Sequence, residues 1–95
     1  MKVRWSRPAS LHLAESGDFV ARDNPTAAHR LVDTIITRTE ALAAHPQLGR
    51  PGRVAETREL VAAGTPHIVA YRVRLGTVEV LAVFHGARRW PDTRG

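Results

Sequence analysis

The chain contains no cysteine, which excludes disulfide bonds and zinc–thiolate sites. It has no apolar run close to the roughly 18 residues that a membrane span requires. Its first residues, Met1 to Pro8, lack the apolar core of a signal peptide. We therefore expect one soluble cytoplasmic domain, residues 1–95, with no contact to a membrane. Without a covalent cross-link, its core or a partner must supply the stability.

Sequence motifs of the common enzyme classes are also missing. The segment Gly49–Gly52 lacks the Lys-Ser/Thr pair and the following helix of a phosphate-binding loop, and no Gly-x-Ser-x-Gly elbow occurs. The five histidines are scattered without the spacing of metal ligands. We expect no metal and no cofactor.

What the chain has in excess is positive charge. Fourteen Lys and Arg residues face nine Asp and Glu residues, a net charge of +5. Most of the excess lies in residues 50–95, which carry eight basic and four acidic side chains. A basic half favours an acidic partner such as nucleic acid or an acidic protein segment, although a merely solvated basic face remains an alternative.

The hydrophobic pattern predicts two helices followed by three strands, after one opening strand. Ser6 and Asn24 are suitable N-caps, each followed closely by a proline, and His45-Pro46 is expected to end the second helix. The predicted elements are a strand at 2–5, helices at 8–22 and 25–44, and strands at 57–61, 67–74 and 78–84. Residues 46–53 are expected to form an irregular loop. The order β-α-α-β-β-β predicts an α+β fold, with a helical hairpin on one face of a mainly antiparallel sheet.

Basic side chains recur on the three C-terminal strands and after them, where they could converge on one edge or face. They are Arg58, Arg72, Arg74, His85, Arg88 and Arg89, with Trp90 beside them. Arginine binds phosphate or carboxylate bidentately, and tryptophan offers a flat apolar surface. In the alternative interpretation, Arg58 pairs with Glu59 or Glu79, and Trp90 covers an edge of the core.

His85 has two interpretations as well. Strict alternation places it on the face of Glu79, Leu81 and Val83, opposite Phe84. It is either a hydrogen-bonded structural residue or a general base whose partner the sequence does not reveal.

Taken together, several short motifs resemble the RelE/ParE superfamily of type II toxins. The motifs are the opening strand with Trp5, Asn24-Pro25-x-Ala27-Ala28, His45-Pro46-x-x-Gly49-Arg50, Thr57-Arg58-Glu59-Leu60, Ile68-Val69-Ala70-Tyr71-Arg72-Val73, and Val83-Phe84-His85-Gly86-Ala87-Arg88-x-Trp90. Their order and spacing cover nearly the whole chain and imply the superfamily's fold.

The resemblance implies one of two activities. RelE-like members are ribosome-dependent endoribonucleases, whereas ParE-like members poison DNA gyrase. Ile68 stands where RelE-like nucleases carry an arginine, and no tyrosine follows the last predicted strand. We therefore expect a ParE-like toxin that is not an enzyme. If it is a ribonuclease instead, its catalytic residues would be Arg88, His85 and Arg58.

The resemblance also implies the partners. The target-binding residues would be Arg58, His85, Arg88, Arg89 and Trp90, and the target would be DNA gyrase or, in the alternative, the ribosome with mRNA. A cognate antitoxin with a flexible C-terminal segment would dock beside the 25–44 helix and the sheet edge. Its expected contacts are Leu31, Ile35, Arg38, Arg72 and Arg74, and a heterotetramer with the antitoxin is one expected assembly.

Overall fold

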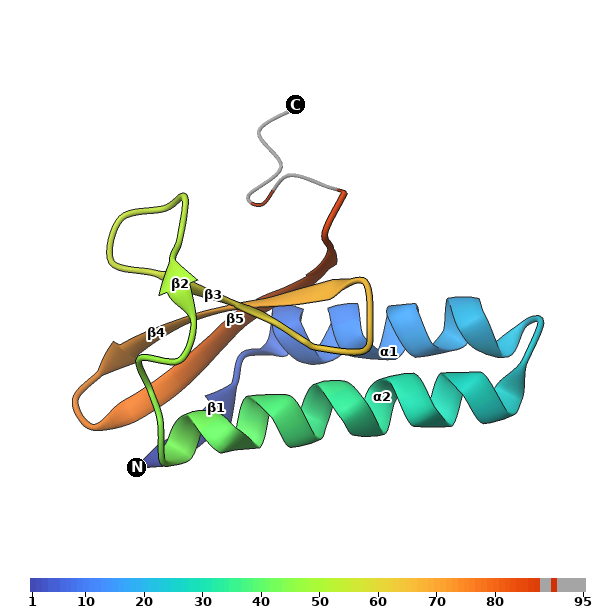
Figure 1. Cartoon of the computed structure of the whole chain (residues 1–95), viewed down its shortest axis with the longest axis horizontal. Coiled ribbons are helices and arrows are strands. Elements are labelled where there is room, and N and C mark those ends of the chain that lie inside the picture. Colours follow the sequence, from blue (N-terminus) through green and yellow to red (C-terminus); the bar gives the residue numbers. More distant parts are fainter. Residues whose placement is uncertain (88–89, 91–95) are drawn as a thin grey trace.

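The computed structural model describes residues 1–87 and Trp90, and it contains two helices beside a five-stranded sheet (Figure 1). In chain order the elements are β1 (Lys2–Trp5), α1 (Arg7–Ala21), α2 (Pro25–Glu40), the short 3₁₀ helix η1 (Ala41–Ala43), β2 (Arg50–Pro51), β3 (Arg58–Val61), β4 (His67–Arg74) and β5 (Thr77–His85). The predicted α+β class is confirmed, and the predicted element order fits apart from the added strand β2. The second helix is predicted to end at 44, but its α-helical part ends at Glu40 and the chain continues as the 3₁₀ helix. Within the described residues, no helix is both long and apolar enough to cross a membrane.

Both helices begin where their caps predict. The Ser6 hydroxyl accepts a hydrogen bond from the Ala9 backbone N–H, and the Asn24 side chain accepts one from Ala27. The two helices run antiparallel (Figure 1), and they approach closely at Gly17, where a Cβ would lie 2.9 Å from Val32 Cγ2. The helical hairpin is therefore confirmed, and Gly17 is explained by this close approach.

The strand order in the sheet is β1-β5-β4-β3-β2. The predicted antiparallel meander of β3, β4 and β5 is confirmed, and β1 adds to it in parallel, next to β5. The expectation of an irregular loop at 46–53 is wrong at Arg50–Pro51, which pairs with Arg58 and Glu59. A proline is tolerated there because β2 is an edge strand.

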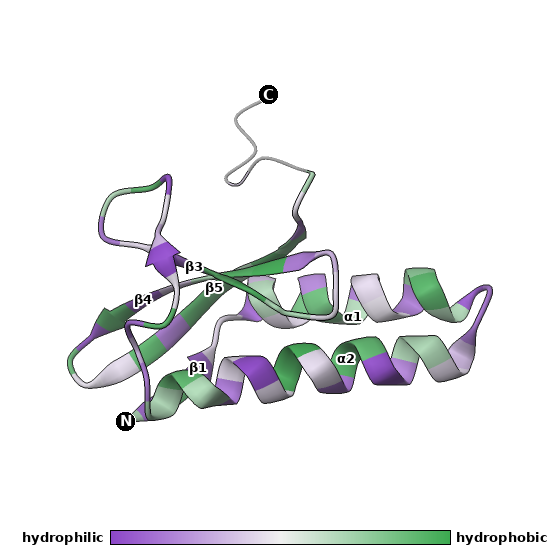
Figure 2. Cartoon of the chain, viewed as in Figure 1, coloured by the Kyte–Doolittle hydropathy of each residue, from purple (hydrophilic) through white to green (hydrophobic). Residues whose placement is uncertain are grey.

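The sheet has two faces with different surroundings, which we call the helix face and the open face. The helix face packs on α1 and α2 and forms the main core, which includes Ile35, Leu42, Val69, Tyr71, Val78 and Val80. The open face carries a smaller apolar cluster of Ile68, Ala70, Ala82 and Phe84, with Trp90 packed against it. Figure 2 shows hydrophobic and hydrophilic bands alternating along the helices, as expected for elements buried on one side only.

A bulge in β5 changes which residues share a face. Ala70 lies opposite Ala82, but Tyr71 lies opposite Val80, so the register skips Leu81. Alternation restarts after the bulge, and the prediction that His85 shares a face with Glu79 is wrong. The backbone N–H of Val83, just past the bulge, donates to His12 Nδ1 of α1 at 3.3 Å.

The β4–β5 hairpin turns on Leu75 and Gly76, and both have positive φ angles, 51° and 72°. Two such residues fit a type I′ turn, in which Asn-Gly is preferred. A leucine there is strained, because its Cβ crowds the backbone in the left-handed region. Its side chain is also 99 % exposed.

We expect Leu75→Asn to raise the free energy of unfolding by about 0.5–1 kcal/mol, because asparagine tolerates the left-handed conformation. Thermal unfolding should show an increase of a few degrees in Tm. The matched control is Leu48→Asn at a site that is 57 % exposed but has no positive φ, and it should show no gain. An unchanged or lower Tm for Leu75→Asn would contradict the strain.

Candidate functional site

Arg58 holds a loop in place. It lies on the helix face of β3, opposite Tyr71. Its guanidinium donates hydrogen bonds to the carbonyl oxygens of Gly49 at 2.8 Å and Gln47 at 3.5 Å. Its Nη1 is therefore engaged by the segment that leads into β2.

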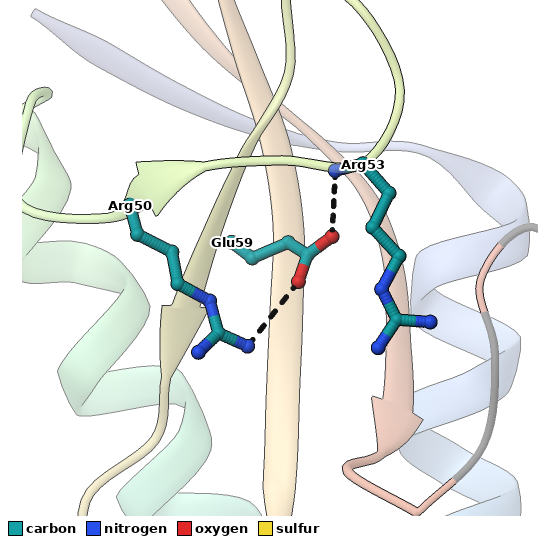
Figure 3. A network of polar contacts seen from close by, with 3 residues as sticks. All are labelled: Arg50, Arg53 and Glu59. Atoms are coloured by element: carbon teal, nitrogen blue, oxygen red, sulfur yellow. Dashed lines mark hydrogen bonds and ion pairs between the residues drawn. The ribbon is translucent and has the colours of Figure 1, made fainter.

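Glu59, next in the chain, is a buried carboxylate on the open face, with 2 % of its surface exposed. It accepts a hydrogen bond from Arg50 Nη2 at 3.4 Å and one from the Arg53 backbone N–H at 3.1 Å (Figure 3). The suggested pairing of Glu59 with Arg58 is wrong, because β2 brings Arg50 opposite Glu59.

His67 and His85 lie side by side where β4 begins and β5 ends. Their rings are 5.7 Å apart at 72°. His85 is exposed, and its Nδ1 accepts a hydrogen bond from the Ala87 N–H at 3.1 Å. His67 is 8 % exposed, and in the part of the chain that the structure describes its Nδ1 has no hydrogen-bond partner.

The expected convergence of Arg58 with His85 does not occur. Arg58 lies opposite Tyr71, whereas His85 lies opposite His67, four positions along β4. At about 3.3 Å per residue, the two are separated by roughly 13 Å along the strand. They do not form one site.

Trp90 belongs to the open face. Its ring stacks on Phe84, with centroids 6.2 Å apart and planes 14° apart, and covers the smaller apolar cluster. This contact matches the alternative in which Trp90 covers an edge of the core. Arg88 and Arg89 lie outside the described residues.

A groove of about 460 Å³ lies between α2 and the β3–β4 turn. Its apolar lining is Val20, Ala27, Leu31, Ala63 and Pro66. Arg30, Arg38 and His67 also line it, and none of its described lining residues is acidic. An apolar floor beside two guanidinium groups suits an acidic, amphipathic protein segment. Neither Arg30 nor His67 was predicted to have this role, because no local pattern distinguishes them.

The structure separates the expected antitoxin contacts. Leu31 and Arg38 line the groove. Ile35 is fully buried in the core, so its side chain is not available to contact the antitoxin as predicted. Arg72 and Arg74 lie at the far end of β4 from the groove, on the open face.

Burial, together with the neighbouring positive charge of His85, lowers the pKa of His67 below its usual 6.5. The unfolded chain then binds more protons than the folded chain below that pH, so stability must decrease as the pH decreases. We expect the Tm to fall between pH 7.5 and pH 5.5 and to fall less in His67→Gln. The matched control is His45→Gln, which replaces an exposed histidine. If the Tm of both variants fell equally with pH, this assignment to His67 would be contradicted.

A second cationic surface lies at the hairpin end of the open face. Glu79 accepts a hydrogen bond from Arg72 Nε at 2.6 Å, so it does not pair with Arg58 as one interpretation suggested. This hydrogen bond lowers the pKa of the Glu79 carboxyl, and the charges of Arg72, Arg74 and Arg4 lower it further. Several positive charges therefore surround a single carboxylate.

The described residues hold no group of three or more His, Cys, Asp or Glu side chains that could bind a metal ion.

Comparisons with known proteins identify relatives of this chain. The family model described as "ParE toxin of type II toxin-antitoxin system, parDE" matches residues 3–90. The chain is 44% identical over 91 residues to Y4kP of Sinorhizobium fredii, which is named as a toxin, covering 96% of this chain and 94% of that protein. It is 32% identical over 87 residues to toxin RelE2 of Caulobacter vibrioides, covering 92% of this chain and 97% of that protein.

Two solved structures from toxin–antitoxin systems are also similar to this chain. The chromosomal ParDE toxin–antitoxin system of P. aeruginosa contains a chain with a TM-score of 0.82 and 25% identity, covering 90% of this chain and 95% of that one. The RelBE2 toxin–antitoxin complex of Mycobacterium tuberculosis matches with a TM-score of 0.65 at 21% identity, covering 88% of this chain and 95% of that one. The second likeness concerns the fold alone.

Proposed function

Because the chain belongs to the ParE toxin family of type II toxin–antitoxin systems, we propose that it arrests growth by binding DNA gyrase rather than by cleaving RNA. In this proposal it acts in the cytoplasm as a single domain, residues 1–95, and blocks the gyrase reaction through contacts alone.

The separation of Arg58 from His85 carries this proposal. Cleavage of RNA needs a cation near the phosphate and an acid–base group within hydrogen-bond reach of the reacting oxygen. Arg58 is engaged by two loop carbonyls and lies roughly 13 Å along the sheet from His85.

The environment of Glu59 adds support. Glu59 is a buried carboxylate of β3, the strand next to the edge of the sheet, and it engages Arg50 of the edge strand β2. The ion pair with Glu59 neutralises Arg50, the nearest guanidinium on this part of the face. This arrangement favours binding by the protein over cleavage of RNA.

One observation favours the ribonuclease alternative. His67 and His85 are two imidazoles in contact, and paired histidines are a common acid–base arrangement. Against it, His67 is 8 % exposed, so a substrate would reach only His85.

Two assays distinguish the proposals. We expect the purified chain to block supercoiling by DNA gyrase and to leave mRNA intact in a translating extract. Addition of the antitoxin should restore supercoiling, which controls for non-specific inhibition. Cleaved mRNA together with unaffected supercoiling would overturn the gyrase proposal.

We also propose that the groove beside α2 receives the flexible segment of the antitoxin. Support comes from the groove itself, since Leu31 and its apolar neighbours are flanked by Arg30 and Arg38. A disordered acidic segment would fold on binding there and would be attracted by the toxin's net charge of +5. Two such toxin–antitoxin pairs would form the expected heterotetramer.

A further inference from the structure

The tip of the β4–β5 hairpin combines two unfavourable features. Leu75 has a φ of 51° and is 99 % exposed, so it is strained and also places a large apolar side chain in water. A residue held in a sparsely populated conformation at an exposed tip is a reason to look for a function. Turn formation alone would be better served by asparagine.

The surface behind this tip is strongly basic. Across three neighbouring strands, Lys2, Thr77 and Arg74 form one row of the open face, and Arg4, Glu79 and Arg72 form the next. The two rows carry four basic side chains and one acidic side chain, a net charge of +3. Rows two residues apart are separated by roughly 7 Å, and the outer strands β1 and β4 by roughly 10 Å.

From this arrangement we propose that Lys2, Arg4, Arg72 and Arg74 bind the phosphate backbone of duplex DNA, with Leu75 projecting into the adjoining groove. Arginine forks match phosphate oxygens, and the hairpin tip beyond the last cation row would place Leu75 next to the groove that the phosphates border. Leu75 would contact base edges there without reading a specific sequence.

An acidic protein segment is a less suitable occupant of this surface. The groove beside α2 already has the apolar floor and arginine rim that such a segment needs, and it lies near His67 at the opposite end of β4 from Arg74. The two ends are roughly 23 Å apart. A cationic face across three strands, with a single exposed leucine at its end, is better matched to a grooved, uniformly charged polymer.

This inference goes beyond gyrase inhibition, because DNA binding is measured with no gyrase present. Either activity can be found without the other, so failure of one proposal is distinguishable from failure of the other.

The test measures binding of the purified full chain to a short fluorescent DNA duplex over a range of NaCl concentrations. Each cation removed, first in Arg74→Gln and then in Lys2→Gln/Arg74→Gln, is expected to reduce the slope of log affinity against log salt by roughly 0.9. Arg22→Gln, at the turn between the two helices, is the matched control and should bind like the wild type.

Leu75→Asn separates the tip's function from its structural role. We expect roughly tenfold weaker binding with an unchanged salt slope, because an apolar contact is lost and no cation is removed. The same substitution should raise the Tm, so weaker binding would not be a consequence of unfolding.

Two results would overturn the proposal. One is DNA binding that the cation and Leu75 variants leave unchanged. The other is competition by a poly-glutamate peptide as effective as that by DNA of equal charge, which would assign the surface to an acidic protein instead.

Discussion

Replacement of Tyr71 by phenylalanine is expected to lower the free energy of unfolding by about 2–4 kcal/mol, because two hydrogen bonds to the backbone are lost together. The buried hydroxyl donates to the Pro46 carbonyl at 2.7 Å and accepts from the Gly49 N–H at 2.9 Å. Both groups belong to the loop that brings β2 to the sheet edge. For a domain of this size the corresponding reduction in Tm is roughly 10–25 °C.

Gly49→Ala tests the same contact from the other side. A Cβ at this position would lie 2.7 Å from Tyr71 Cε1, 2.8 Å from its hydroxyl oxygen and 3.0 Å from the Glu59 carbonyl oxygen. We expect Gly49→Ala and Tyr71→Phe each to lower the free energy of unfolding. The double variant should lower it by less than the sum of the two, since both substitutions disrupt the same Gly49–Tyr71 contact. Leu48→Ala, in the same loop but exposed, should change stability by less than about 0.5 kcal/mol.

Protein stability at alkaline pH gives an independent test of the environment of the Tyr71 hydroxyl. Burial raises the pKa of its hydroxyl above the usual 10.0, despite opposing effects of the hydrogen bond from Gly49 and the charge of Arg58. Above pH 10 the folded chain therefore retains a proton that the unfolded chain loses, and stability must decrease as the pH increases. Because the chain has one tyrosine, one lysine and no cysteine, Tyr71→Phe should remove most of this decrease. An identical pH profile for the two proteins would contradict this account.

Charge reversal in the groove is the second large effect. The double variant Arg30→Glu/Arg38→Glu is expected to weaken antitoxin binding by about 100-fold, roughly 2.8 kcal/mol. Both arginines line the groove, and reversal replaces attraction of an acidic segment by repulsion at two points. A titration of toxin with antitoxin measures the affinity, and co-expression should no longer restore growth.

A control with the same change in net charge distinguishes the effect of contacts in the groove from that of the protein's overall electrostatic field. Arg7→Glu/Arg74→Glu alters two exposed arginines that do not line the groove. We expect it to reduce the association rate slightly and leave the dissociation rate unchanged. If both double variants weakened antitoxin binding equally, the groove would not be the docking site.

Local signals predicted most of this fold. Ser6 and Asn24 begin the helices, and the alternation in residues 67–74 predicts β4 with its observed ends. The pairing of β1 with β5 could not be predicted, because four residues that suit a strand do not specify their neighbour. The bulge at Leu81 could not be predicted either. Because β5 is apolar on both faces, a shift of register does not change its hydrophobic pattern.

The functional surfaces were harder to predict than the fold. Arg58 binds backbone carbonyls, and such partners leave no signal in a sequence. Glu59 meets Arg50 only because a two-residue strand forms in a segment rich in glycine and proline. The groove brings α2 next to the β3–β4 turn, so its arginines could not be grouped before the helices were docked on the sheet.

The parallel pairing of β1 with β5 determines the order in which the chain can fold during synthesis. Val3 lies opposite Val78, so β1, which is synthesised before β5, must wait for it before gaining these hydrogen bonds. The β3–β4–β5 meander and the helical hairpin have short loops to close and can form earlier, whereas the long loop between β1 and β5 closes late. A growing chain therefore completes its rows of cations across β1, β5 and β4 only at this final step, and a chain interrupted before β5 would lack them.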